Sequence, residues 1–319
     1  MMRKRTYPII AIEEHYLDAE LVTHFAAGES GGGPREAGLR DLGEKRIKAM
    51  DEAGVDIAVL SHNAPGGQKL EADIAVPLIA RVNDRLAEVV AGHPDRFAAF
   101  AALPTAQPEA AADELERTVG MGFKGAMLHG LANGEFLDKP KFRPIFARAE
   151  ALDVPIYLHP SAPHPAVTQA YYQDYAKDFP TVVRPAWGFT VETATQAIRL
   201  ILSGIFEEHP KLKIILGHLG ETLPFLMWRI DEALARPGQK SLSFRDVFCS
   251  NFWVTTSGFF SDPALLCTMM EMGAERVLFA VDWPYADNRA AVDWLDTAPV
   301  SGDDKAKIFS GNARHLLRM

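Results

Sequence analysis

The chain contains eight short, almost continuously apolar segments that are spread along its whole length. They cover residues 8–12, 55–60, 97–103, 123–128, 154–158, 213–217, 252–256 and 277–281. Short runs that are apolar at nearly every position are typical of strands buried on both faces, whereas half-exposed strands alternate apolar and polar residues. The pattern therefore predicts eight buried parallel strands.

Helical periodicity fills the intervals between these strands. The expected helices cover residues 43–54, 73–93, 108–121, 141–152, 190–208, 221–236, 263–273 and 287–297, with a closing helix near 304–317. A regular alternation of strands and helices is typical of a parallel sheet whose crossovers are helical. With eight such units, we expect an α/β fold of the (β/α)8 TIM barrel type.

Two stretches exceed what a bare barrel needs. The chain has 319 residues, whereas a bare barrel takes about 250. We therefore expect a single barrel domain, 1–319, with loop insertions at the C-terminal mouth: a glycine-rich one at 17–42 and one rich in proline and tyrosine at 161–189. Both follow strands with candidate ligands at their ends, which indicates a lid or a substrate pocket, although solvent loops or oligomer contacts fit equally well.

Charge and hydropathy exclude some partners. The chain has 42 acidic and 33 basic residues and a net charge of −9, which argues against nucleic acid as a ligand. No apolar run approaches the roughly 20 residues that span a bilayer, so we expect no membrane insertion. The N-terminus is basic, but the apolar segment after it is short and interrupted by Glu13 and Glu14, unlike a signal peptide. We therefore expect a cytoplasmic protein.

Acidic and imidazole side chains stand at the ends of several predicted strands. Glu13 and His15 follow the first strand, His159 the fifth, His218 the sixth, and Asp282 the eighth. Each alone is equally typical of a turn, a helix cap or a core histidine, but a carboxylate directly after an apolar run is costly without a cation or a donor. Strand ends converge at the mouth of a barrel. One divalent metal ion, zinc or manganese, bound by two carboxylates and two imidazoles among these residues explains them together.

Longer motifs carry a resemblance to a known family. The segments are AIEEH (11–15), VLSHNAPG (59–66), HPDRFAAFAALP (93–104), LDVPIYLHP (152–160), the stretch 189–231 with LGHLGETLPFLMWRID, FWVTTSG (252–258) and VLFAVDWPY (277–285). In this order they resemble the metal-dependent decarboxylase branch of the amidohydrolase superfamily, which includes γ-resorcylate (2,6-dihydroxybenzoate) decarboxylase and aminocarboxymuconate semialdehyde decarboxylase. The segments 216–231 and 282–285 are most similar to those of the resorcylate and hydroxybenzoate decarboxylases.

The resemblance implies roles for particular residues. Glu13, His15, His159 and Asp282 align with the four metal ligands, and His218 aligns with a histidine behind them that Glu221 orients. Glu221 equally suits the start of a helix, where a carboxylate stabilises the dipole. Arg229 aligns with a residue near the substrate carboxylate, although a surface ion pair with a neighbouring acidic residue fits too. Members of the branch are commonly oligomers, so we expect a homodimer or homotetramer.

Further residues are candidates for substrate binding by position. They are His62 and His129 at strand ends, Tyr285 after Asp282, and Trp187 at the end of the second insertion. Either histidine could equally be structural. His129 stands where relatives can carry asparagine, and the insertion 17–42 has little likeness to the resorcylate enzymes, so both departures affect the choice of substrate.

The implied reaction is the non-oxidative decarboxylation of a small hydroxylated aromatic, or related muconate-type, carboxylic acid. Asp282 is the candidate proton donor to the ring carbon that carries the carboxylate. A metal-dependent hydrolase or hydratase of the same superfamily is the alternative. The E-x-H motif and the lack of a lysine at the end of the fourth strand favour a site with one metal ion and no hydrolysis. A barrel that serves only as a scaffold would not need four ligands at one mouth.

Overall fold

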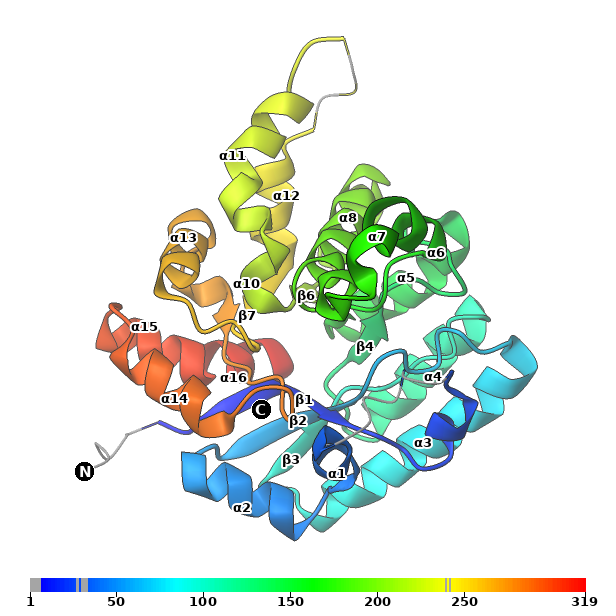
Figure 1. Ribbon diagram of the computed structural model, residues 1–319, viewed down its shortest axis with the longest axis vertical. Coiled ribbons are helices and arrows are strands. Elements are labelled where there is room, and N and C mark those ends of the chain that lie inside the picture. The colour runs from blue at the N-terminus through cyan, green and yellow to red at the C-terminus, as the bar shows by residue number, and fades with distance from the viewer. Residues whose placement is uncertain (1–6, 27–28, 30–33, 239, 241) are drawn as a thin grey trace.

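Eight parallel strands form the centre of the protein, and helices surround them (Figure 1). The computed structural model describes residues 7–26, 29, 34–238, 240 and 242–319. The strands are β1 (Ile10–Tyr16), β2 (Ile57–His62), β3 (Phe97–Ala99), β4 (Ala126–His129), β5 (Ile156–His159), β6 (Ile214–Leu216), β7 (Phe252–Thr255) and β8 (Val277–Leu278). Each lies within or overlaps a predicted apolar segment, although β3 and β8 are shorter than expected.

The strands close into a ring. Strands β1 to β3 pair in order, and so do β4 to β8. A parallel bridge between Ala101 and Ala126 joins β3 to β4, and a second one between Glu14 and Trp283 joins β8 to β1. The second seam also has a backbone bond in which the Asp282 N–H donates to the Glu13 carbonyl at 3.0 Å. The predicted eight-stranded barrel is therefore confirmed.

The crossover helices lie close to their predicted positions. They are α2 (Glu44–Ala53), α3 (Ala72–Gly92), α4 (Pro108–Gly120), α5 (Arg143–Leu152), α8 (Gly188–Leu202), α11 (Leu223–Leu234), α13 (Asp262–Met272) and α14 (Asn288–Thr297). The expected helix 190–208 is divided, because Gly204 adopts φ +80 before α9 (Ile205–Glu208). The closing helix is also divided, into α15 (Gly302–Ala306), a π-helical turn and α16 (Asn312–Leu317). Helix α12 (Phe244–Asn251) was not predicted.

The interior of the barrel is filled by alternate strand residues. Ile10, Ile12, Val59, Phe100, Met127, Tyr157, Ile215, Leu278 and Ala280 form one buried cluster, against which α16 packs. The intervening strand residues, such as Leu60, Leu158 and Val281, belong to a second cluster shared with the helices. This two-residue alternation is the normal geometry of a strand. Because of this alternation, the position of a residue along a regular strand predicts whether its side chain faces the barrel interior or the surrounding helices.

A one-residue bulge in β1 changes that direction at the ligand motif. Ala11 pairs with Ala58, but the next pairing is Glu14 with Leu60, so β1 contains one residue more than β2 over this interval. A bulge of this kind reorients the side chains that follow it. Glu14 therefore aligns with the outward-facing Leu60, and Glu13 and His15 join Ile10 and Ile12 on the inward side.

The two insertions contain short helices rather than open loops. The first has a 3-10 turn (Leu21–His24) and α1 (Pro34–Arg40), and a Cβ on Gly38 of α1 would lie 3.0 Å from Pro284, just beyond Asp282. This contact places α1 beside the barrel mouth. Residues 27–28 and 30–33 of this candidate lid, which include most of its glycine cluster, lie outside the described part of the chain, as do the basic residues 1–6.

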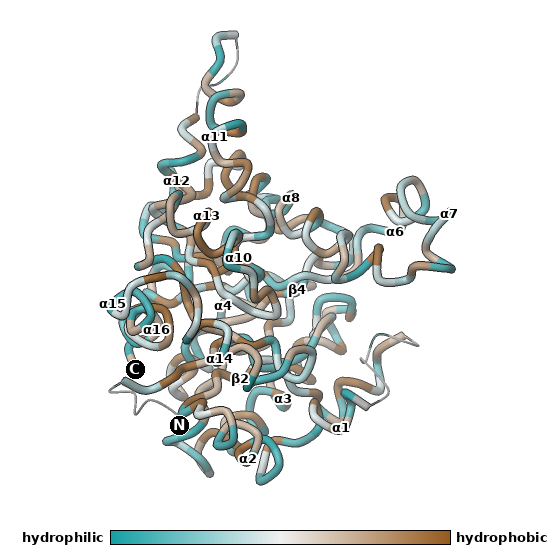
Figure 2. Tube along the Cα trace, turned by 60° about the vertical axis from the view of Figure 1, so that its left-hand side comes forward, coloured by the Kyte–Doolittle hydropathy of each residue, from teal (hydrophilic) through white to brown (hydrophobic). Residues whose placement is uncertain are grey.

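The second insertion and one helical pair project from the barrel. Helices α6 (Pro165–Val167) and α7 (Gln173–Ala176) stand out on one side, and α11 and α12 form an arm at the top (Figure 2). Among the described residues, no helix combines the length and apolarity needed to cross a membrane.

Candidate metal centre and active site

Four of the predicted residues meet inside the barrel mouth. Glu13, His15, His159 and Asp282 each offer one ligand atom, and these atoms lie within 4.8 Å of one another. The Nε2 of His159 lies 3.2 Å from Oε1 of Glu13, and the Nε2 of His15 lies 3.2 Å from Oδ1 of Asp282. Atoms bound to one divalent ion at about 2.0–2.2 Å lie on the order of 3–4 Å apart. The spacing therefore suits a single ion.

The hydrogen bonding of the cluster also fits a metal. Among the described residues, Oε1 of Glu13 and Nε2 of His15 have no hydrogen-bond partner, although both are buried. Buried polar atoms without partners are costly and rare in folded proteins. A cation placed between them would satisfy both atoms. The Asp282 side chain is 17% exposed, whereas those of Glu13 and His15 are fully buried, so the cluster is open on the Asp282 side.

The histidine tautomers are consistent with ligation through Nε2. Nδ1 of His159 lies 2.7 Å from the Pro160 carbonyl, which can only accept, so the proton is assigned to Nδ1. Nδ1 of His15 lies 3.3 Å from the Ser61 hydroxyl. Such partners on the far ring nitrogen are the usual way in which a protein fixes a metal-binding imidazole. Both Nε2 lone pairs then point into the cluster.

Protons and the metal compete for the same atoms. Burial lowers the pKa of His15, but the carboxylates of Asp282 and Glu13 outweigh burial and raise this pKa to about 9. The protonated form therefore persists up to that pH, and a metal ion must displace the proton. We expect metal affinity to rise about tenfold per pH unit below this pKa and to level off above it. Chelator competition over a pH series measures this, and a constant affinity below the pKa would contradict it.

His218 and Glu221 lie on an unusual turn after β6. Four non-glycine residues have positive φ, between 50 and 66: His218, Leu219, Glu221 and Thr222. Gly220, which lies among them, has φ 83. Non-glycine residues in this region cost about 1–3 kcal/mol each and persist where the surroundings fix them. The Nδ1 of His218 lies 2.7 Å from Oε1 of Glu221. Burial lowers the pKa of His218, but the Glu221 carboxylate raises it to about 10. The turn thus presents a cationic imidazole to the site.

Asp282 also has a left-handed backbone, with φ +71. The Tyr285 N–H donates to its carbonyl at 2.7 Å, and its own N–H bonds to β1. Opposite it, Gly258 has φ +59, and a Cβ there would lie 3.3 Å from Oδ2 of Asp282. Glycine therefore serves both the local conformation and the close approach of the carboxylate.

Two predicted substrate residues lie next to the cluster. Nδ1 of His129 is 3.1 Å from Nδ1 of His159, and burial holds the pKa of His129 well below its usual value. The Tyr285 ring lies 6.0 Å from the His15 ring, and its hydroxyl donates to Asn63 at 2.9 Å. The other substrate candidates lie elsewhere.

His62 points away from the cluster, toward the first insertion. Its Nδ1 donates to the Asn63 carbonyl, and its Nε2 accepts from the Asp18 N–H at 3.0 Å. Its ring packs edge to face against Tyr16 and Phe25. Burial lowers the pKa of His62 to about 4, so the ring is neutral. These contacts anchor the insertion, and a role in substrate binding stays a prediction.

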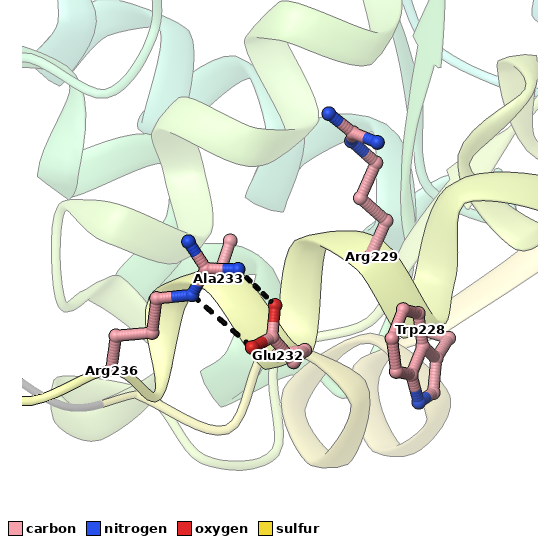
Figure 3. Close-up of a pocket in the computed structure, with 5 residues that line it drawn as sticks. All are labelled: Trp228, Arg229, Glu232, Ala233 and Arg236. Atoms are coloured by element: carbon pink, nitrogen blue, oxygen red, sulfur yellow. Dashed lines mark hydrogen bonds and ion pairs between the residues drawn. The ribbon is translucent and has the colours of Figure 1, made fainter.

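Arg229 and Trp187 also lie apart from the ligands. Arg229 of α11 lines a surface pocket of about 320 Å³ whose other residues are Trp228, Glu232, Ala233 and Arg236 (Figure 3). None of these belongs to the four-residue cluster. Trp187 precedes α8 and is 50% exposed. Contact of either residue with substrate stays a prediction.

The structure adds residues that the sequence did not single out. The Tyr157 and Thr255 hydroxyls both donate to Oε2 of Glu13. Arg35 of the first insertion lies over the Tyr285 ring, 5.7 Å from its centre, and Arg184 of the second acts on the same phenol electrostatically. The two-residue alternation of strands could have identified Tyr157, because it predicts that this side chain faces the barrel interior. No pattern could have identified Arg35 or Arg184, because the insertions have no regular period.

Comparison with known proteins gives matches along almost the entire chain. A family model described as amidohydrolase matches residues 18–319. The chain is 40% identical over 327 residues to the γ-resorcylate decarboxylase of Rhizobium sp. strain MTP-10005, covering 97% of this chain and 98% of that protein. A crystal structure of a 2,6-dihydroxybenzoate decarboxylase complexed with 2,6-dihydroxybenzoate has a TM-score of 0.89 and 39% identity, covering 98% of this chain and 99% of the other. A dihydroxybenzoic acid decarboxylase from Polaromonas sp. JS666, solved with manganese and the inhibitor 2-nitroresorcinol, has a TM-score of 0.89 and 38% identity over 98% and 97% of the two chains.

Proposed function

The chain belongs to the amidohydrolase family, and we propose that it is a metal-dependent, non-oxidative decarboxylase of dihydroxybenzoate-type acids whose preferred substrate is 2,6-dihydroxybenzoate. The family expected from the sequence is therefore confirmed. One observation carries the proposal: the full-length match to decarboxylases of this acid coincides with a mouth that gathers two carboxylates and two imidazoles.

We assign the metal to Glu13, His15, His159 and Asp282, with one ion per chain. Manganese is our first choice, because a similar protein was solved with it, and zinc is the second, because both suit mixed oxygen and nitrogen ligands. When bound by these residues, a divalent ion would supply positive charge that stabilises the negative charge of the acid during the reaction.

The protein's own groups supply the proton and the orientation. Asp282, on the exposed side of the cluster, donates a proton to the ring carbon that carries the carboxylate, forming a C–H bond. The bond to the carboxylate then breaks, carbon dioxide leaves, and the electron pair returns to the ring and restores its aromaticity. His218, held by Glu221, donates a hydrogen bond to a substrate oxygen. His129 and Tyr285 form the walls, and the cations Arg35 and Arg184 favour an anionic acid at the mouth.

The test is direct. Protein purified without added ions is analysed for metal, and carbon dioxide release is measured from 2,6-dihydroxybenzoate and other hydroxybenzoates with manganese and with zinc. We expect close to one ion per chain and the highest kcat/KM for an acid with two ortho hydroxyls. Equal or higher kcat/KM for an acid without an ortho hydroxyl would contradict the substrate assignment.

We also propose that the protein is a homodimer or homotetramer. Large side chains are exposed on the two projecting parts: Tyr171, Tyr175, Phe179 and Trp187 on the second insertion, and Phe225 and Trp228 on α11. Exposed aromatic surface of this kind is enriched at protein interfaces. Light scattering at micromolar concentration should give two or four times the chain mass of 35.1 kDa. A monomer mass would contradict this proposal without affecting the decarboxylase assignment.

A further inference from the structure

The two oxygens of the Glu13 carboxylate have different surroundings. Oε1 faces Nε2 of His159 at 3.2 Å and has no hydrogen-bond partner among the described residues. Oε2 accepts from the Tyr157 hydroxyl of β5 and from the Thr255 hydroxyl of β7, the latter at 3.2 Å. Glu13, Tyr157 and Thr255 are all buried, and all three lie on odd-numbered strands, which contribute side chains to common layers inside such barrels.

The hydrogen bonds continue beyond Glu13 to the turn that carries His218. The Thr255 hydroxyl lies 2.9 Å from that of Tyr157 and 2.7 Å from that of Ser257. The Ser257 hydroxyl in turn accepts from the His218 backbone N–H at 3.1 Å. One chain of three hydroxyls thus joins a metal ligand of β1 to the residue that begins the left-handed turn after β6.

The direction of every proton in this chain follows from the two ends. An ionised carboxylate only accepts, so with Glu13 ionised as a metal ligand the single Tyr157 proton goes to Glu13. The single Thr255 proton is also directed to Oε2 of Glu13, which leaves Ser257 as the donor in its contact with Thr255. Ser257 is free to accept from His218 at the same time. All three hydroxyl dipoles therefore point toward Oε2, and hydrogen bonds to an ionised acceptor are stronger than neutral ones.

A glycine makes room for this arrangement. Gly217 follows β6 at an inward-facing position and has an ordinary φ of −69, so its conformation does not require glycine. A Cβ there would lie 3.2 Å from Oε2 of Glu13, and 3.3 Å from both the Ser257 and Tyr157 hydroxyl oxygens. These contacts are tighter than ordinary van der Waals distances. Any larger residue at this position would crowd the side chains of Glu13, Ser257 and Tyr157 at the same time.

We propose that Tyr157, Thr255 and Ser257 are positioning residues that hold Glu13 as a one-oxygen metal ligand, so that metal affinity depends on hydroxyls outside the ligand set. This inference rests on the metal site of the proposed function. With Oε2 occupied by two donors, only Oε1 is left for the ion, and the carboxylate cannot rotate without losing both bonds. Partners of metal ligands typically contribute about 10- to 100-fold to metal affinity.

The test compares variants that remove single hydroxyl groups. Tyr157→Phe and Thr255→Val keep the buried volume, and each should weaken manganese binding by about 10- to 100-fold in chelator competition. The double variant should lose less than the product of the two single losses, because both hydroxyls serve one acceptor oxygen. Tyr16→Phe is the matched control, since this buried tyrosine of β1 has no hydrogen-bond partner for its hydroxyl among the described residues.

Further readouts separate positioning from general damage. Thermal unfolding of the metal-free variants shows whether each one folds, and Gly217→Ala provides an independent variant that should also weaken manganese binding by crowding the same oxygens. At saturating manganese, kcat of Tyr157→Phe should recover to within a few-fold of the wild-type value, because the residue acts through Glu13.

Each outcome decides between the two proposals. If the folded Tyr157→Phe and Thr255→Val proteins bind manganese as tightly as the Tyr16→Phe control, the positioning role is wrong and the decarboxylase proposal is unaffected. If they bind it more weakly but the wild-type protein decarboxylates no hydroxybenzoate, the positioning role stands and the proposed function is wrong.

Discussion

Replacing Asp282 with asparagine should lower decarboxylation by about 10²- to 10⁴-fold while the metal remains bound. Asparagine keeps the shape of the side chain and one oxygen ligand, but it has no carboxyl proton to give to the ring carbon. The Asp282 carboxylate is the partly exposed member of the cluster, which is the position that a proton donor needs. Steady-state kinetics and metal analysis of the same preparation measure both effects.

A matched control lies five residues further along the chain. Asp287 caps α14 by accepting from the Ala290 N–H at 2.8 Å, and it does not belong to the cluster. Asp287→Asn should therefore keep both metal and rate. If Asp282→Asn kept its metal and lost less than about tenfold in rate, Asp282 would not be the proton donor.

Replacing His159 with alanine should remove most of the metal and, with it, nearly all activity, while the barrel still folds. The side chain lies at the mouth, where its loss removes one ligand of four and the hydrogen bond to Pro160. It does not belong to either of the two apolar clusters that hold the strands together. Metal analysis and circular dichroism of the purified variant test the two halves of this expectation.

The control for this variant is His209→Ala. His209 is a partly buried histidine, and its Nδ1 pairs with Glu150 at 2.9 Å outside the cluster. We expect this variant to keep its metal content. Full metal occupancy in His159→Ala would show that the ligand assignment is wrong.

The barrel could be predicted because each strand and each helix has its own pattern within a short stretch of sequence. Strands buried on both faces read as short apolar runs, and the amphipathic helices between them have their own period, so eight units were visible in the sequence. Helix α12 was missed because it has only eight residues, too few for a clear period. The division at Gly204 was missed because periodicity continues across a change in backbone direction.

Strict alternation along β1 would have given the wrong direction for Glu13. Ile10 and Ile12 face the interior, so an unbroken strand would have turned Glu14 inward and Glu13 outward. The bulge reverses this, and it depends on pairing with β2 and β8, which lie about 45 and 265 residues away. The two-residue spacing of Glu13 and His15 places both side chains on one face of a strand, but it does not say which face.

The turn at 218–222 was not predictable from single residues. The sequence indicated a helix starting at Glu221, but four non-glycine residues have positive φ, which neither their propensity nor their period favours. Tertiary bonds fix the turn: the His218 N–H donates to Ser257, and the Thr268 hydroxyl donates to the Leu219 carbonyl. Strain of this kind is concentrated at functional sites, where the surroundings maintain it.

The fate of the proton tests the central claim most directly. In deuterated water, the wild-type enzyme loaded with manganese should release carbon dioxide from 2,6-dihydroxybenzoate and place one deuterium on the ring carbon that lost the carboxylate, as mass spectrometry or NMR would detect. If no hydroxybenzoate gives this labelled product while esters, lactones or amides are hydrolysed at the same metal site, the protein is a hydrolase and the decarboxylase assignment is wrong.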